Sequence, residues 1–129
     1  MKDAINWAQQ FVYISVEEEN IIIQAKNSLL FKDGNIWAKK GPIFFDIGQG
    51  SYDGAESCEL VGLFILAQLQ KIGNLNVGIY RDDGLASSPA SPRQVDILKK
   101  KIAAVFNQHG QGITVEANIK LVDFLDVIF

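Results

Sequence analysis

The feature that most constrains this fold is a pair of long helical segments with a short hairpin between them. Residues 55–70 contain no proline and are nearly all apolar in their middle, which is typical of a helix buried on most sides. Residues 93–108 carry apolar side chains at helical spacing behind a serine and a proline that begin helices well. Between them, residues 76–80 and 85–87 predict two strands joined by a tight turn at Asp82-Asp83-Gly84.

Further strand signals flank these elements. Residues 42–47, 113–117 and 121–129 are short apolar or β-branched runs bounded by turn residues. The resulting order is strand, helix, strand, strand, helix, strand, strand, which is close to a split βαβ sheet. We therefore predict an α+β chain with a ferredoxin-like sheet whose helices cover one face.

The first forty residues predict two helices and a hairpin. Asp3 is expected to begin a short helix, and the signature of a capping box from Ser15 onward predicts a second helix over 16–28. The first helix has three apolar residues on one face: Ile5, Ala8 and Phe11. Asp33-Gly34 between two apolar runs is a strong hairpin signal.

Composition narrows the class of protein. The chain has 129 residues, a size typical of one domain, and a net charge of −3, which argues against a broad phosphate-binding face. Its one cysteine, Cys58, excludes an internal disulfide and is interpreted as a small core residue. The strongest apolar run, 60–69, is shorter than a membrane span, and no secretory signal is found at the start. We expect an intracellular protein, cytoplasmic or nuclear, with no membrane partner.

Two adjacent aspartates in the turn, Asp82 and Asp83, are the best candidates for chemistry. Their charges repel each other, and one Asp-Gly turn would serve folding equally well. A divalent cation would remove the repulsion, because Mg²⁺ prefers oxygen ligands and is commonly held by one or two carboxylates together with substrate phosphates. The alternative from these residues alone is an ordinary exposed turn.

The residues around this turn carry a resemblance to a known family. Tyr80-Arg81-Asp82-Asp83 resembles the Tyr-x-Asp-Asp signature of reverse transcriptases, and it follows an apolar strand as it does in that family. Gly48-Gln49-Gly50-Ser51 and the helix over 56–69 resemble the segment of these enzymes that lies under the template–primer. Residues 113–118 and 124–127 resemble the next two blocks, the last being similar to the Phe-Leu-Asp ending of Penelope-like and related retroelement polymerases.

The resemblance implies an architecture. Residues 1–41 would be a helical and hairpin remainder of the fingers, and residues 42–129 a partial polymerase palm. The resemblance also implies that Asp82 and Asp83 are catalytic and hold Mg²⁺ or Mn²⁺. It assigns template–primer or nucleotide binding to four residues: Gly50, Ser51, Tyr80 and Arg81. The implied partners are an RNA or DNA template–primer, a dNTP, and the upstream and downstream polymerase segments.

Family members carry another catalytic aspartate on an earlier strand, which this order would place before residue 1. We therefore expect a fragment of an RNA-directed DNA polymerase that is inactive as an isolated chain. Two alternatives stay open for individual residues. The residue pattern alone makes Asp46 a stand-in for the third carboxylate, whereas the resemblance, which we favour, places Asp46 on the approach to the glycine segment at 48–51. Arg81 can either contact a phosphate or form an ion pair with the two aspartates. A non-catalytic ferredoxin-like remnant or interaction module is the alternative function.

Overall fold

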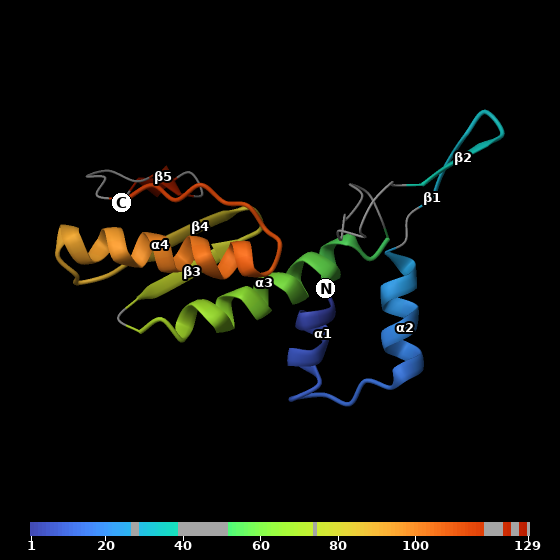
Figure 1. Ribbon diagram of the computed structural model, residues 1–129, viewed down its shortest axis with the longest axis horizontal. Helices are drawn as coiled ribbons and strands as arrows, with labels where there is room; N and C mark the ends of the chain where they lie inside the picture. Colours follow the sequence, from blue (N-terminus) through green and yellow to red (C-terminus); the bar gives the residue numbers. More distant parts are fainter. Residues whose placement is uncertain (27–28, 39–51, 74, 118–122, 125–126, 129) are drawn as a thin grey trace. The chain divides into compact units, whose positions relative to one another are not determined.

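The computed structural model describes most of the chain, namely residues 1–26, 29–38, 52–73, 75–117, 123–124 and 127–128. These residues form an α+β chain with four helices and six short strands, which confirms the predicted class (Figure 1). The chain divides into two compact units, Met1–Val61 and Gly62–Phe129. The predicted boundary after residue 41 lies outside the described residues. No helix in the described part of the chain is long and apolar enough to cross a membrane.

The first unit begins with helix α1 (Lys2–Ala8), whose N-cap is Met1, so that the predicted start at Asp3 is wrong by two residues. Asp3 instead lies in the first turn, where a carboxylate is favoured by the helix dipole. Ile5 and Ala8 are buried as predicted, but Phe11 is 74% exposed. The helix has ended by then, and the ring of Phe11 packs against that of Trp7 at 5.2 Å between centroids.

Helix α2 (Val16–Ala25) begins with the predicted capping box. The backbone N–H of Glu18 donates to the Ser15 hydroxyl at 3.2 Å, and the backbone N–H of Ser15 donates to the Glu18 carboxylate at 2.8 Å. Two N–H groups that the helix itself leaves without partners are thereby satisfied. The helix ends earlier than predicted, with Lys26 as its C-cap.

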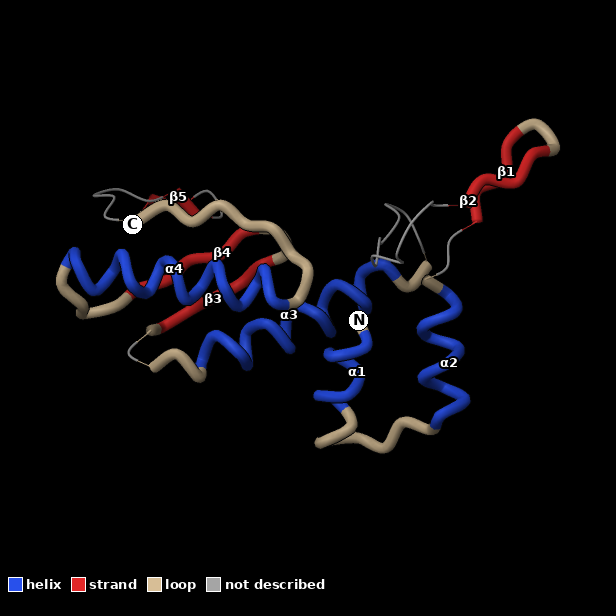
Figure 2. Tube along the Cα trace, viewed as in Figure 1, coloured by secondary structure: helices blue, strands red, loops and turns tan. Residues whose placement is uncertain are grey.

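Three antiparallel hairpins supply the strands, and each forms its own two-stranded sheet in the part of the chain described (Figure 2). They are β1 (Leu29–Lys32) with β2 (Asn35–Ala38), β3 (Asn76–Tyr80) with β4 (Asp83–Ser87), and β5 (Asp123–Phe124) with β6 (Val127–Ile128). The first two hairpins lie in the segments where the sequence predicts them, although β4 begins at Asp83 and not at the predicted residue 85.

The C-terminal strands differ from the prediction. Residues 113–117 form no strand, and the predicted single strand over 121–129 is replaced by the short β5 and β6. A strand needs a neighbour for its backbone hydrogen bonds, and the segment at 113–117 has none among the described residues. The predicted strand at 42–47 lies outside them, so no single split βαβ sheet is described.

The two long helices agree with the prediction to within one residue: α3 is Gly54–Gln70 and α4 is Pro92–Gln108. The second unit is built around the buried Phe64, Ile65 and Leu69 of α3. However, α3 is not covered on most sides, because Leu63 is 56% exposed and Cys58 is exposed as well. The interpretation of Cys58 as a core residue is therefore wrong. The neighbours of α3 cover only part of its circumference.

Candidate metal site at the β3–β4 hairpin

The register of the β3–β4 hairpin decides where the aspartates lie. Tyr80 pairs with Asp83 and Ile79 with Gly84, so the loop consists of only Arg81 and Asp82. The predicted turn at Asp82-Asp83-Gly84 is thus displaced by one residue. Asp83 and Gly84 extend the ladder instead of turning the chain. One carboxylate consequently lies in the loop, and the other lies on the first residue of β4.

The two faces of this hairpin have different surroundings. Side chains alternate along a strand, so Tyr80 and its partner Asp83 share one face, whereas Val77 and Ile79 lie on the other. Val77 and Ile79 are half-buried, and Tyr80, Asp82 and Asp83 are exposed. Burial of Val77 and Ile79 therefore holds the hairpin, and its tip presents both carboxylates to solvent.

Arg81 has an unusual backbone and a definite side-chain contact. Its φ of 54° lies in the left-handed region, which few residues other than glycine adopt. Its guanidinium carbon lies 5.5 Å from the centroid of the Tyr80 ring, within the range of a cation–π interaction. Among the described residues, which include both aspartates, Arg81 forms no ion pair. The alternative in which Arg81 neutralises Asp82 and Asp83 is therefore wrong for this structure.

The anionic donors at the tip are the two exposed carboxylates of Asp82 and Asp83. Mg²⁺ is commonly coordinated by one or two carboxylates and retains several water ligands. Asp82 and Asp83 would provide two such carboxylates on adjacent residues. The described part of the chain contains no group of three or more histidine, cysteine, aspartate or glutamate side chains that could share a metal. Gly50, Ser51 and Asp46 lie outside the described residues, so their predicted roles stay predictions.

The structure also shows a charged pair in the first unit that sequence reasoning missed. Lys26, at the end of α2, is nearly buried and forms an ion pair with Asp53, the residue before α3. The Lys26 ammonium, by donating to this carboxylate, holds the pKa of Asp53 below its usual range. The carbonyl of Asp53 also accepts a hydrogen bond from the Ser57 N–H at 3.1 Å. No sequence signal joins residues 27 positions apart; the pair follows from folding, and it links the end of α2 to the start of α3.

Comparisons with protein-family models, with curated proteins and with solved structures gave no match to this chain.

Proposed function

We propose that this chain is part of an RNA-directed DNA polymerase related to reverse transcriptases, in which Asp82 and Asp83 hold Mg²⁺ for nucleotidyl transfer. The observation that carries the proposal is the exposed pair of carboxylates at the tip of a two-residue hairpin loop. The order helix α3, hairpin, helix α4 around this tip supports it. The same order of elements is expected around the Tyr-x-Asp-Asp signature that residues 80–83 resemble.

The chemistry of the tip fits this role. A divalent ion bound there would neutralise phosphate charge and lower the pKa of an attacking hydroxyl. Asp82 and Asp83 would supply the anionic ligands, and the half-buried Val77 and Ile79 would keep the hairpin in place beneath them. Arg81 would stay close to incoming phosphates, with its guanidinium resting over Tyr80.

The isolated chain is proposed to be inactive in polymerisation. A two-metal centre needs carboxylates from separate strands, and this chain offers two neighbouring ones at the tip. Gly50 and Ser51 would approach the template–primer in the complete enzyme, and Asp46 is the residue able to supply a third carboxylate. An alternative is a non-catalytic ferredoxin-like remnant or interaction module. The described residues form three two-stranded hairpins, and the predicted strand at 42–47 that would belong to a palm sheet lies outside them.

A metal titration tests the proposed site. Adding Mn²⁺ to the ¹⁵N-labelled chain should broaden the amide signals of residues 79–85 first, because paramagnetic relaxation falls steeply with distance. The double variant Asp82→Asn, Asp83→Asn should lose this broadening. Asp33→Asn, which removes a carboxylate from the loop of the other hairpin, is the matched control and should leave it intact. Unchanged broadening in the double variant would remove the site.

Primer extension separates the two candidate functions. The chain alone should extend no primer with Mg²⁺ or Mn²⁺, whereas a version lengthened upstream to include another acidic strand should do so. Extension by the chain alone that disappears in Asp46→Asn would show that Asp46 completes the centre. A lengthened version that binds Mn²⁺ at the hairpin but never extends a primer would favour the non-catalytic module.

A further inference from the structure

The second unit contains a groove that lies outside the proposed metal site. It has a volume of about 340 Å³ and is bounded by the turn after α3, the loop before α4 and the first half of α4. Six residues form most of its wall: Ile72, Pro89, Gln94, Ile97, Leu98 and Lys101. This volume is at the lower end of the range of small-molecule sites, so a small ligand would fit.

Local hydrogen bonds hold the backbone around the groove. On one side, the Ile72 N–H donates to the Leu69 carbonyl at 3.0 Å, and Leu69 itself is 1% exposed. On the other side, the Ala90 N–H donates to the Ser88 hydroxyl at 3.3 Å. The side-chain carbonyl of Gln94 accepts from the backbone N–H of Ser91 at 2.9 Å, which fixes the start of α4. These hydrogen bonds hold the backbone of the turn and of the loop on the two sides of the groove.

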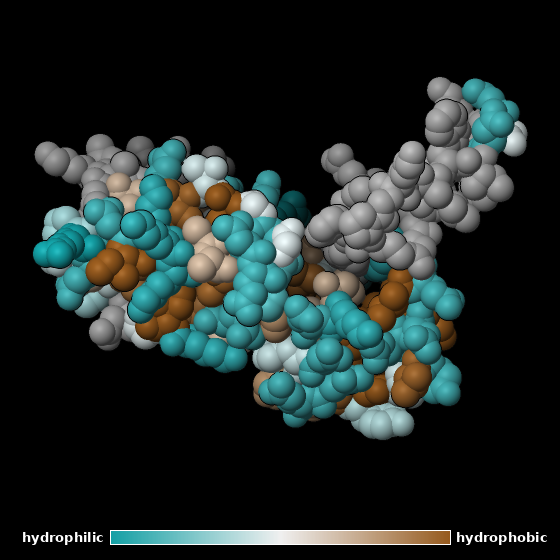
Figure 3. All heavy atoms as spheres, in the orientation of Figure 1, coloured by the Kyte–Doolittle hydropathy of each residue, from teal (hydrophilic) through white to brown (hydrophobic). Residues whose placement is uncertain are grey.

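The wall combines aliphatic side chains with one amide, that of Gln94, and one cation, that of Lys101. Gln94, Ile97, Leu98 and Lys101 are spaced three and four residues apart, so they share one face of α4. Ile97 is 51% exposed, and hydrophobic atoms lie open to solvent between α4 and the end of α3 (Figure 3). Lys101 forms no ion pair within the described residues. The nearby Lys71 donates to the Gln68 side chain at 2.9 Å.

From this combination we infer that the groove binds a small aliphatic monocarboxylate, with its hydrocarbon chain against Ile72, Ile97 and Leu98 and its carboxylate beside the Lys101 ammonium. The apolar wall supplies most of the affinity, because burial of each methylene tightens binding by about fourfold. Lys101 supplies the preference for an anion. An ion pair at an exposed site is weak, so its contribution is about threefold to fivefold.

The test uses octanoate, octanamide and acetate, each titrated into the ¹⁵N-labelled chain at pH 7 and followed by NMR. Octanoate should shift the amides of Gly73, Ala90 and Ile97, and it should bind about threefold to fivefold more tightly than octanamide. Acetate, which lacks the hydrocarbon chain, should produce no saturable shift. Octanoate shifts located elsewhere, or saturable binding of acetate, would overturn the inference.

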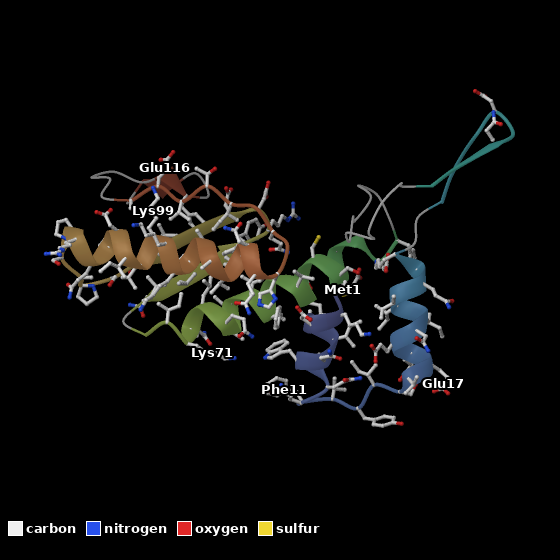
Figure 4. The ribbon with its side chains drawn as sticks, viewed as in Figure 1. Met1, Phe11, Glu17, Lys71, Lys99 and Glu116 are labelled. Carbon is white, nitrogen blue, oxygen red and sulfur yellow. The ribbon has the colours of Figure 1, made fainter. Side chains whose placement is uncertain are left out.

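Two lysine variants on the same helix provide the matched comparison. Lys101→Met keeps the aliphatic stem but removes the charge, so it should bind octanoate and octanamide equally. Lys99→Met removes the same charge from a residue about 200° around the helix. Figure 4 labels Lys99 near Glu116, on the side of α4 away from Lys71. This control should retain the preference for octanoate. A preference that survives in Lys101→Met, or disappears in Lys99→Met, would contradict the assigned role of Lys101.

Discussion

The first two hairpins of this chain have loops of the same length but different chemistry. In the loop of β1–β2, Asp33 and Gly34 both have positive φ, 52° and 74°, which is the backbone that Asp-Gly adopts readily in a tight hairpin. The loop of β3–β4 holds Arg81 and Asp82, with Arg81 at a φ of 54° and glycine displaced to position 84.

The loop of β1–β2 therefore has residues that favour its backbone conformation, whereas the loop of β3–β4 does not. An arginine in the left-handed region costs about 1 kcal/mol relative to glycine. Strained backbone of this kind is concentrated at functional sites. The unfavourable loop is the one that resembles a catalytic signature, which supports the proposal that its residues serve a ligand.

The largest effect should come from the core of the unit that contains the strained hairpin. Leu69 is 1% exposed, so Leu69→Ala should reduce the free energy of unfolding of that unit by about 2–5 kcal/mol through lost burial and a residual cavity. Leu63 is on the same helix and is 56% exposed. Leu63→Ala should change stability by less than about 0.5 kcal/mol, measured by urea denaturation. Equal effects would contradict the assigned core.

The next largest difference should come from one glycine in each hairpin, namely Gly34 in the loop of β1–β2 and Gly84 in strand β4. Gly34→Ala places a side chain at a φ of 74° and should destabilise the first hairpin by about 1 kcal/mol. Gly84 lies within β4, and an added Cβ would meet only the Gly78 carbonyl oxygen at 3.7 Å, an ordinary contact. Gly84→Ala should therefore be close to neutral. Amide hydrogen exchange in each hairpin measures the change in stability caused by each substitution. A larger loss of stability from Gly84→Ala than from Gly34→Ala would contradict the register of β3 and β4.

Relief of the strain at Arg81 should have a smaller effect of opposite sign. Arg81→Gly removes a backbone penalty of about 1 kcal/mol but also a cation–π contact worth about 0.5 kcal/mol at an exposed site. The expected net change is a stabilisation of a few tenths of a kcal/mol, seen as slower amide exchange in β3 and β4. Arg81→Val, which resists the left-handed region, should instead destabilise the hairpin.

The smallest expected effect is the loss of stability at low pH in the unit that contains the first hairpin. The pKa of Asp53 is lowered by Lys26, so the pair stabilises the fold fully above the unfolded pKa of about 3.9. This contribution is lost as pH falls below 4 through the folded pKa. Asp53→Asn should therefore weaken the dependence of the free energy of unfolding on pH in this range. The Ser15 N–H lowers the pKa of Glu18 in the same direction, so Glu18→Gln should remove a separate part of the slope.

The sequence by itself determined the local elements. The capping box at Ser15, the Asp33-Gly34 loop and the start of α4 at Ser91 and Pro92 were predicted because each depends on residues within one turn of one another. The boundaries of α3 and α4 were correct to one residue for the same reason. The motif at residues 80–83 is likewise recognised from the sequence, and it lies in a hairpin as predicted.

Only the tertiary structure decided the features that depend on residues far apart. It joined Lys26 to Asp53 and left Cys58 exposed on α3. It also left residues 113–117 without a strand partner among the described residues. In each case, several segments of the chain could have paired with the same backbone group or covered the same side chain. Local propensity does not contain that competition, because it is settled only when distant segments pack together.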